Sequence, residues 1–251
     1  MKIELEKVSH AFGPLSILED FSAVFPSLEV TVLLGPSGCG KTTLLNILAG
    51  LIIPRSGSVQ IGGNPCTELK VGYMFQDIRL VPWLTVQKNL ELVLPSSLPR
   101  EEKRKRVEKI LQLVELSQAS ELYPSELSGG MSRRAGMARA YLFEPEVYLM
   151  DESFQGLDPP LKFQLLRTFL HLRSVDPRTT LFVTHDIEEA LLVGDKIHVL
   201  SPAPTRIRYS VRNPVPAEKR YPGHPEFSPL ERDLFAVLSG ESFPNTTIPV
   251  V

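Results

Sequence analysis

The stretch that decides the fold of this 251-residue chain is Gly35-Pro36-Ser37-Gly38-Cys39-Gly40-Lys41-Thr42-Thr43. It follows the pattern G-x-x-x-x-G-K-T, in which backbone N–H groups and a helix N-terminus surround the phosphates of a nucleotide. Residues 28–34 before it (LEVTVLL) predict a buried strand, and residues 43–51 after it (TLLNILAGL) are apolar at helical spacing. We expect Lys41 to reach the β- and γ-phosphates and Thr42 to place its hydroxyl on Mg²⁺. The sequence therefore predicts a protein that binds a nucleoside triphosphate.

The composition is that of an ordinary globular protein, with 43% hydrophobic and 22% charged residues. A net charge of −2 gives no reason to expect a nucleic-acid partner, which usually requires a basic surface. Cys39 and Cys66 supply neither a disulfide framework nor a metal site, which favours a reducing cytoplasm. The N-terminal residues lack the apolar segment of a signal peptide, and no run reaches the roughly 18 apolar residues of a membrane span. Any action at a membrane is therefore expected to occur through a partner.

Hydrophobic periodicity predicts alternating strands and helices along the chain. The expected strands cover residues 2–8, 16–25, 28–34, 57–63, 71–75, 147–150, 179–183 and 196–200, with a turn at 10–15. The expected helices cover residues 43–51, 85–93, 101–116, 127–142, 161–172 and 187–192. In the expected helix at residues 101–116, acidic and basic residues alternate. This run of charges therefore indicates a solvated helix face rather than a nucleic-acid patch.

The character of the sequence changes at Ser201. Prolines at positions 202, 204, 214, 216, 222, 225, 229, 244 and 249 oppose long regular elements. Only residues 229–238 (PLERDLFAVL) look helical, with Pro229 in the first turn. We expect residues 201–251 to form an ordered extension, packed on a domain that covers residues 1–200 and frayed after Gly240.

A second stretch, Leu127-Ser128-Gly129-Gly130-Met131, narrows the many protein classes that share a phosphate loop. Ser128 is a good N-cap, and the two glycines let the backbone approach an anion at a helix N-terminus. With this stretch the chain resembles the ATP-binding-cassette (ABC) ATPases, whose signature is Leu-Ser-Gly-Gly-Gln. The resemblance implies that Ser128, Gly129 and Gly130 contact the γ-phosphate of ATP held by a second copy, in a head-to-tail dimer around two nucleotides. It also implies an α/β P-loop NTPase fold: a parallel-sheet core, an antiparallel β-subdomain and a helical subdomain at about residues 77–132.

The remaining motifs follow in the order of the family, and the resemblance covers residues from about 2 to 200. It implies that Asp151 holds Mg²⁺ through water and that Glu152 is the general base, or the group that orients the attacking water. Gln76 resembles the Q-loop glutamine, which contacts Mg²⁺ or water and faces the membrane partner. His185 resembles the switch histidine that contacts the γ-phosphate. Asp158 resembles the D-loop aspartate that reaches across the dimer.

One aromatic residue, Phe12, stands where the family keeps a ring that stacks on adenine. It could equally belong to the core. Trp83, within residues 79–86 (RLVPWLTV), is interpreted as a packing residue of the helical subdomain rather than as a ligand contact.

Several positions depart from the commonest family pattern. Met131 cannot complete the capping box that glutamine would form with Ser128, yet this form of the signature resembles the nitrate, sulfonate and taurine importers. Ser153 and Gln155 stand where relatives usually carry Pro and Gly, and Ser132-Arg133-Arg134 differs from the commoner Arg-Gln-Arg. We expect neither departure to touch a phosphate ligand, so that hydrolysis is at most slower or differently gated.

The function implied by the resemblance is that of an ATP-hydrolysing importer subunit at the cytoplasmic face of the cell membrane. It would energise uptake of a small solute through a separate permease, supplied by an extracellular solute-binding protein. Nitrate, a sulfonate, taurine, bicarbonate and a pyrimidine precursor all remain open as the solute. One alternative is an ABC ATPase outside transport, a class that usually carries two cassettes or long coiled coils. The other is a regulatory subunit that binds ATP without hydrolysis, against which Glu152, Gln76 and His185 argue.

Overall fold

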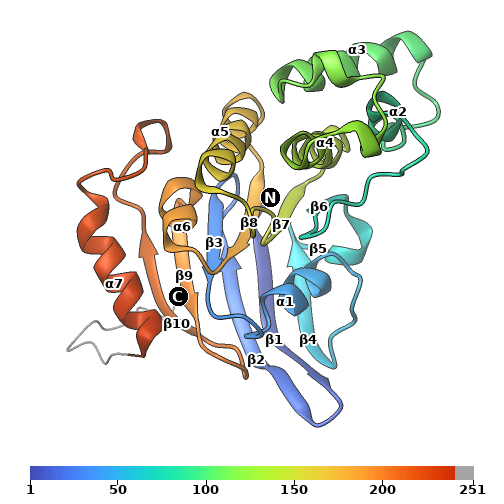
Figure 1. The fold of residues 1–251 in the computed structure, drawn as a ribbon. Coiled ribbons are helices and arrows are strands. Elements are labelled where there is room, and N and C mark those ends of the chain that lie inside the picture. Colours follow the sequence, from blue (N-terminus) through green and yellow to red (C-terminus); the bar gives the residue numbers. More distant parts are fainter. Residues whose placement is uncertain (241–251) are drawn as a thin grey trace. The chain divides into compact units, whose positions relative to one another are not determined.

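The computed structural model describes residues 1–240, and the chain divides into two compact units. The first joins Met1–Leu69 with the chain from Thr179 onward, and the second is Lys70–Arg178 (Figure 1). Residues 241–251, where fraying was expected, lie outside the described part.

The first unit contains an antiparallel sheet of order β2-β1-β4-β5. Its strands are β1 (Ile3–Phe12), β2 (Leu15–Phe25), β4 (Ser56–Ile61) and β5 (Asn64–Pro65). The expected turn at residues 10–15 is wrong in its extent, because β1 and β2 stay paired up to Phe12 and Leu15. The turn is confined to Gly13 and Pro14, and Gly13 supplies a φ of 58° that glycine adopts without strain. This sheet is the antiparallel element that the sequence predicts.

A second set of strands in this unit runs in the order β10-β9-β3-β8. Its members are β3 (Val30–Leu34), β8 (Thr179–Thr184), β9 (Lys196–Leu200) and β10 (Ile207–Arg212). β3 pairs in parallel with both β8 and β9, and every residue of β3 and β8 is buried, as the apolar runs predict for a parallel core. The helices of the unit are α1 (Lys41–Leu48), α6 (Ile187–Val193) and α7 (Phe227–Ser239), with short 3₁₀ turns η1 (Cys66–Glu68) and η4 (Ala217–Lys219).

The prolines of the tail leave room for a strand that the sequence analysis missed. β10 lies between Pro204 and Pro214 and pairs antiparallel with β9. Its residues alternate between half-buried and exposed, a period-2 pattern that could have identified it. Figure 1 shows the tail, in orange to red, passing beside β9 as β10 and then as α7, which contacts α6 and β9. Pro229 lies in the first turn of α7, as expected.

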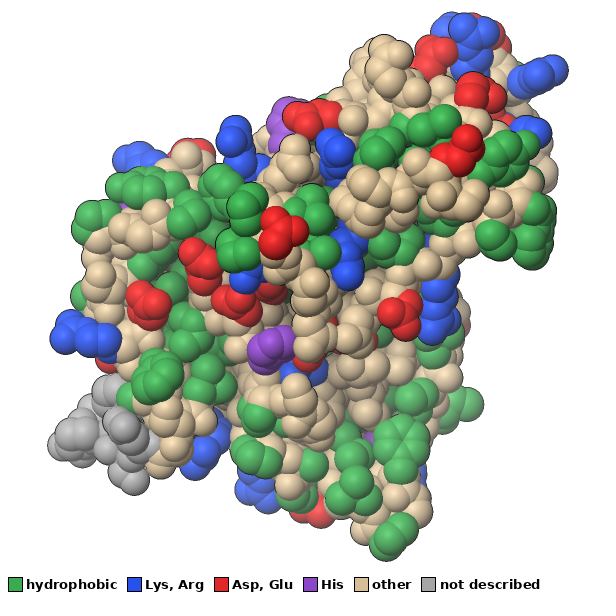
Figure 2. Space-filling model, in the orientation of Figure 1, with side chains coloured by type: hydrophobic (Ala, Val, Ile, Leu, Met, Phe, Trp, Pro, Cys, Tyr) green, Lys and Arg blue, Asp and Glu red, His purple; other side chains and the backbone are tan. Residues whose placement is uncertain are grey.

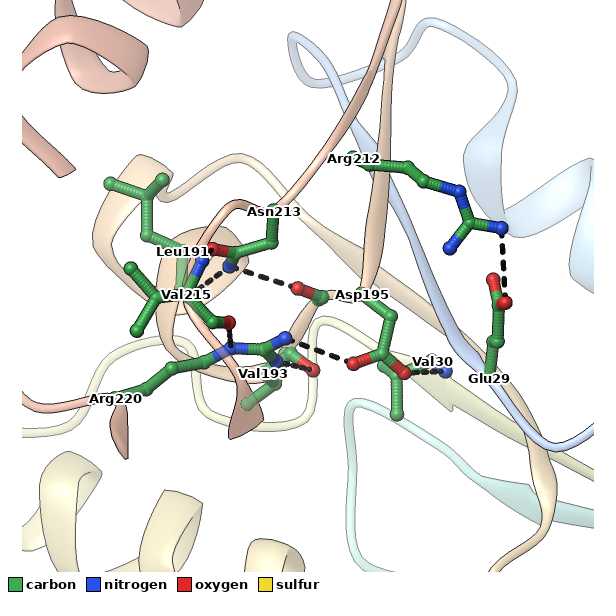
Figure 3. A network of polar contacts seen from close by, with 10 residues as sticks. Glu29, Val30, Leu191, Val193, Asp195, Arg212, Asn213, Val215 and Arg220 are labelled. Carbon is green, nitrogen blue, oxygen red and sulfur yellow. Dashed lines mark hydrogen bonds and ion pairs between the residues drawn. The ribbon is translucent and has the colours of Figure 1, made fainter. Parts of the chain in front are cut away.

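Arg220 ties the tail to the parallel strands through the polar network of Figure 3. Its side chain is only 3% exposed, and its guanidinium lies 2.9 Å from Asp195 Oδ1. It also donates to the carbonyl oxygens of Val215 and Val193. The other carboxylate oxygen of Asp195 accepts the Val30 N–H at 2.9 Å, at the start of β3. The tail and the strand that leads into the phosphate loop therefore share one half-buried carboxylate.

The second unit combines a parallel strand pair with helices. Its strands are β6 (Val71–Met74) and β7 (Val147–Asp151). Its helices are α2 (Val86–Glu91), α3 (Arg100–Leu113), α4 (Gly129–Leu142) and α5 (Pro159–Val175), with 3₁₀ turns η2 (Ser117–Ala119) and η3 (Pro124–Glu126). Tyr148 of the fully buried β7 packs edge-on against Tyr141 and is stacked 6.4 Å from Phe169, at the centre of this unit.

Helix α3 confirms the interpretation of its charge run. Val107, Ile110 and Leu111 are buried along one face, and the charged side chains of both signs are interspersed on the other (Figure 2). Three of the ion pairs there join residues four positions apart: Arg104–Glu108, Lys105–Glu101 and Arg106–Glu102. Pairs of this kind support an exposed helix without any ligand.

Trp83 is not the packing residue that the sequence analysis expected, because 75% of its surface is exposed. The loop that carries it is held by Asn89, which is fully buried on α2. The Asn89 amide accepts the Val81 N–H at 2.7 Å and donates to the carbonyl oxygens of Val81 and Leu84. The loop is thus anchored through its backbone, which leaves the indole in solvent.

Candidate functional site

The phosphate loop spans residues 35–40, between the end of β3 and the start of α1. Gly38 and Gly40 have φ values of 77° and 100°, which favour glycine. At Gly40 a Cβ atom would also lie 2.5 Å from Thr205 Oγ1 and 2.7 Å from Ile17 Cγ2, so no side chain fits. Helix α1 has no side-chain cap and no acid in its first turn. A helix N-terminus carries a partial positive charge, so the start of α1 favours a bound anion.

Lys41 is buried inside this loop, with 4% of its surface exposed. Its Nζ donates to the carbonyl oxygens of Gly35 at 2.8 Å and Pro36 at 2.9 Å. Cys39 is 1% exposed, so it contributes backbone rather than a reactive thiol to the loop, whereas the hydroxyl-bearing Thr42 is exposed. The loop thus holds a cation at its centre and presents a hydroxyl at its rim.

A residue that the sequence analysis did not single out, Thr205, supports the loop from the tail. Thr205 is fully buried, and its hydroxyl lies within hydrogen-bond distance of the carbonyl oxygens of Cys39 and, at 2.9 Å, Ile17. Its backbone N–H donates to the same Ile17 oxygen at 2.8 Å. Thr205 therefore links the phosphate loop to strand β2. The sequence carries no signal for this contact beyond a threonine that follows Pro204.

His185 follows β8 directly and lies beside the start of the phosphate loop. Leu34 and Thr184 are partners in the parallel register of β3 and β8, and the Gly35 N–H donates to the Thr184 oxygen at 3.3 Å. The residue after the histidine, Asp186, caps α6 by accepting the N–H groups of its first turn. His185 itself is exposed on this braced turn, as a ligand-contacting side chain requires.

Phe12 ends β1 opposite Leu15, and 53% of its surface is exposed. The alternative that Phe12 belongs to the core is wrong. Its ring lies edge-on to His10, 4.9 Å between ring centres, and an exposed ring of this kind is free to stack on a base. The adenine contact stays a prediction.

The two acidic residues predicted for the site, Asp151 and Glu152, differ in their surroundings. Asp151 is the last residue of β7 and is 5% exposed, and it accepts a hydrogen bond from the Tyr73 hydroxyl at 3.3 Å. Burial, followed by the negative charge of Asp151, raises the pKa of Tyr73, so the phenol stays a donor. Glu152 is half-buried and has a φ of 42°, a left-handed conformation that is rare for glutamate. Backbone strain of this kind concentrates at functional sites.

The signature stretch starts α4 with the expected cap. Ser128 is exposed and its hydroxyl accepts the Met131 N–H at 3.2 Å, so half of the capping box survives the methionine. Gly129 has open space around it, whereas a Cβ at Gly130 would lie 2.6 Å from Leu161 Cδ1 of α5. The first glycine therefore leaves the helix start accessible, and the second allows two helices to pack closely.

Asp158 has a local structural role. It caps α5 by accepting the Leu161 N–H at 3.3 Å, and the helix begins at Pro159, two residues earlier than expected, because proline suits the first turn. The Asp158 side chain is exposed, and its contact across a dimer stays a prediction.

The expected metal ligands are distributed over both units. Thr42 belongs to the first unit, and Gln76 and Asp151 belong to the second, which also holds Glu152 and Ser128. A hydroxyl, an amide oxygen and a carboxylate are hard oxygen donors, the set that Mg²⁺ takes together with nucleotide phosphates. The residues present therefore fit Mg²⁺ in kind.

Within residues 1–240, no helix has the length and apolar character needed to cross a membrane.

Comparison with known proteins places this architecture in a class. The dimeric post-hydrolysis structure of the ATP-binding cassette MJ0796 bound to ADP and Pi matches 85% of this chain and 99% of its own, with a TM-score of 0.73 at 28% identity. The structure of cbiO1 from Clostridium perfringens matches 84% of this chain and 88% of its own, with a TM-score of 0.75 at 25% identity. The fold is therefore that of an ATP-binding cassette, an α/β P-loop NTPase, which confirms the expected fold class.

Sequence relatives narrow the class. A sequence model of the family described as ABC transporter matches residues 18–155. The aliphatic sulfonates import ATP-binding protein SsuB of Bacillus subtilis (strain 168) is 40% identical over 194 residues, which are 76% of this chain and 75% of SsuB. The sulfate/thiosulfate import ATP-binding protein CysA of Escherichia coli (strain K12) is 39% identical over 212 residues, which are 80% of this chain but only 58% of CysA. The chain belongs to the ABC transporter family.

Proposed function

We propose that this chain is the ATP-binding and ATP-hydrolysing subunit of an importer, working as a pair of copies beneath a membrane permease. The observation that carries the proposal is the phosphate loop with Lys41 buried at its centre and an uncapped helix N-terminus behind it. Family membership and the import functions in the names of SsuB and CysA support the transport role.

The proposed chemistry assigns a task to each group. The loop N–H groups and Lys41 bind the β- and γ-phosphates. Thr42, Gln76 and Asp151 would hold Mg²⁺, which would supply positive charge to the phosphate oxygens. Glu152 orients a water molecule toward the γ-phosphate and accepts its proton, while His185 contacts the γ-phosphate oxygens.

Two copies would complete each site. Ser128, Gly129 and Gly130 of a second copy would bind the γ-phosphate at the start of α4, as anions bind at helix N-termini. ATP then favours the closed pair and hydrolysis releases it, so that the cycle drives the permease. The dimeric form of the MJ0796 cassette supports this arrangement.

The permease and the solute-binding protein, rather than this chain, would determine which solute is transported. Of the solutes left open by the sequence, a sulfonate is best supported, because SsuB is a sulfonate import protein that this chain matches over three quarters of its length. The solute that co-purifies with the binding protein of the complete importer, identified by mass spectrometry, tests this choice. A nitrate or a nucleobase precursor there would overturn it.

The experiment for the ATPase itself compares Glu152→Gln with the unaltered chain by light scattering. We expect the variant to bind MgATP, to lose hydrolysis and to double its mass only with MgATP, because the carboxylate that activates water is gone while the phosphate contacts remain. Glu121→Gln, an exposed carboxylate of the same unit, is the matched control and should hydrolyse normally. Hydrolysis at the normal rate by Glu152→Gln would refute the role of Glu152, and no ATP binding by the unaltered chain would refute the whole proposal. ATP binding without turnover in the complete importer would favour the regulatory alternative.

A further inference from the structure

Three of the departures from the family pattern, at positions 133, 153 and 155, meet in one polar cluster around Gln76. Gln76 follows β6 and Gln155 lies in the turn after β7, and both side chains are exposed. The Gln76 Nε2 group donates to Gln155 Oε1 at 2.5 Å. The residue usual at position 155 is glycine, which could not make this contact.

The Arg133 side chain, on α4, binds backbone carbonyl groups of the same turn. Its guanidinium donates to the Ser153 and Gln155 carbonyl oxygens, the latter at 3.3 Å, and reaches the Gln76 oxygen at 3.5 Å. The planar fork of arginine presents several donors in fixed directions, so one side chain can serve carbonyls of two segments. A glutamine, the residue usual at position 133, has a single NH₂ group and could not serve all three.

Ser153 completes the link between the two segments. It is 1% exposed, and its hydroxyl donates to the Met74 oxygen of β6 at 3.2 Å. Proline at this position would provide no donor. The turn after β7 is thus joined to the end of β6 by a buried hydroxyl, by a guanidinium and by the Gln76–Gln155 side-chain bond.

The direction of the Gln76–Gln155 bond matters for a metal. Gln76 uses its NH₂ group toward Gln155, which leaves its Oε1 atom available, and oxygen is the atom that Mg²⁺ accepts as a ligand. An exposed glutamine without such a partner samples several rotamers and both amide orientations, and ordering it on binding costs conformational entropy.

We propose that Gln155 is a positioning residue that orients the amide of Gln76 with its oxygen toward Mg²⁺, and that Arg133 holds Gln155 in place. This inference rests on the proposed function, because it takes Gln76 as a Mg²⁺ ligand. It assigns one shared role to the departures at positions 133, 153 and 155, namely a Q-loop ordered before the metal arrives. The chain should therefore bind Mg²⁺ with its nucleotide more tightly than a version with glycine at position 155.

The test measures metal binding without hydrolysis, in the full chain carrying Glu152→Gln. Mn²⁺ is titrated into the ATP-bound protein and followed by electron paramagnetic resonance. Gln155→Met keeps the size of the side chain but removes the acceptor, and we expect it to raise the Mn²⁺ dissociation constant about threefold to tenfold. Gln155→Gly should do the same, and Arg133→Lys should weaken binding in the same direction. Gln155→Glu retains an acceptor oxygen and should stay within about twofold of the parent.

Two controls separate this role from a merely structural one. Affinity for ATP in EDTA and the melting temperature should be unchanged in Gln155→Met, because the side chain is exposed. Equal Mn²⁺ affinity in Gln155→Met and the parent would overturn the proposal, as would equal weakening in Gln155→Met and Gln155→Glu. If the parent itself shows no shift in melting temperature with MgATP, the proposed function has failed, and this inference falls with it.

Discussion

Replacing Thr205 with valine tests whether the tail supports the phosphate loop. Valine has nearly the shape of threonine but no hydroxyl, so it removes the donor shared by the Cys39 and Ile17 oxygens and little else. Thr205 is fully buried, and withdrawing a donor from buried carbonyls costs about 1–3 kcal/mol. For a protein of this size each kcal/mol lowers the melting temperature by roughly 2–4 °C. Since Cys39 precedes Gly40 and Lys41, we expect part of that loss, about 1 kcal/mol, to appear as an approximately fivefold weaker affinity for MgATP.

The assay pairs calorimetric titration of MgATP with thermal unfolding, for Thr205→Val and for Thr205→Ser. Serine keeps the hydroxyl and deletes a buried methyl group, so it should lose about 1 kcal/mol of stability yet bind MgATP normally. The two variants would then be similar in melting temperature and different in affinity. Normal MgATP affinity in Thr205→Val, despite a lower melting temperature, would refute the reasoning and reduce Thr205 to a packing contact.

Two further predictions concern the same unit. Burial lowers the pKa of His198 to about 4, from about 6.5 in an unfolded chain, so the folded state keeps the imidazole neutral and its stability is complete above pH 6.5. Each pH unit between the two pKa values changes the free energy of unfolding by about 1.4 kcal/mol. The free energy of unfolding measured by urea titration should therefore fall by up to about 3 kcal/mol as the pH drops from 6.5 to 4. If His198→Phe leaves this dependence of stability on pH unchanged, the prediction is contradicted. Arg220→Met removes the buried partner of Asp195 and should lower the free energy of unfolding by about 3–5 kcal/mol, whereas Arg212→Met, which loses an exposed pair with Glu29, should cost at most about 1 kcal/mol. Equal losses in the two arginine variants would mean that the Arg220 pair does not anchor the tail.

The parts of the site that the sequence predicts well are those encoded by neighbouring residues. Gly38 and Gly40 are needed for backbone angles that only glycine adopts easily, Ser128 caps the helix that follows it, and Asp151 ends an apolar run that forms a buried strand. Each of these features depends on a few adjacent residues, so a linear pattern is enough to recognise it. The same holds for α3, whose buried face repeats at helical spacing.

Local patterns failed where a distant segment settles the outcome. β10 carries an alternating pattern, but among prolines it forms a strand because β9 offers an edge to pair with. Trp83 has the large apolar side chain of a core residue. Asn89 nevertheless holds its loop through the backbone, and the indole stays exposed.

The contacts that tune the site are also beyond a linear reading. Thr205 and Cys39 are 166 positions apart, and Gln76 and Gln155 are 79 apart. Their types are compatible with many surface roles, because a hydroxyl or an amide acquires a specific partner only when folding brings one within hydrogen-bond distance. The motifs of this chain therefore predict its chemistry, whereas the residues that position the site side chains are brought into contact only by folding.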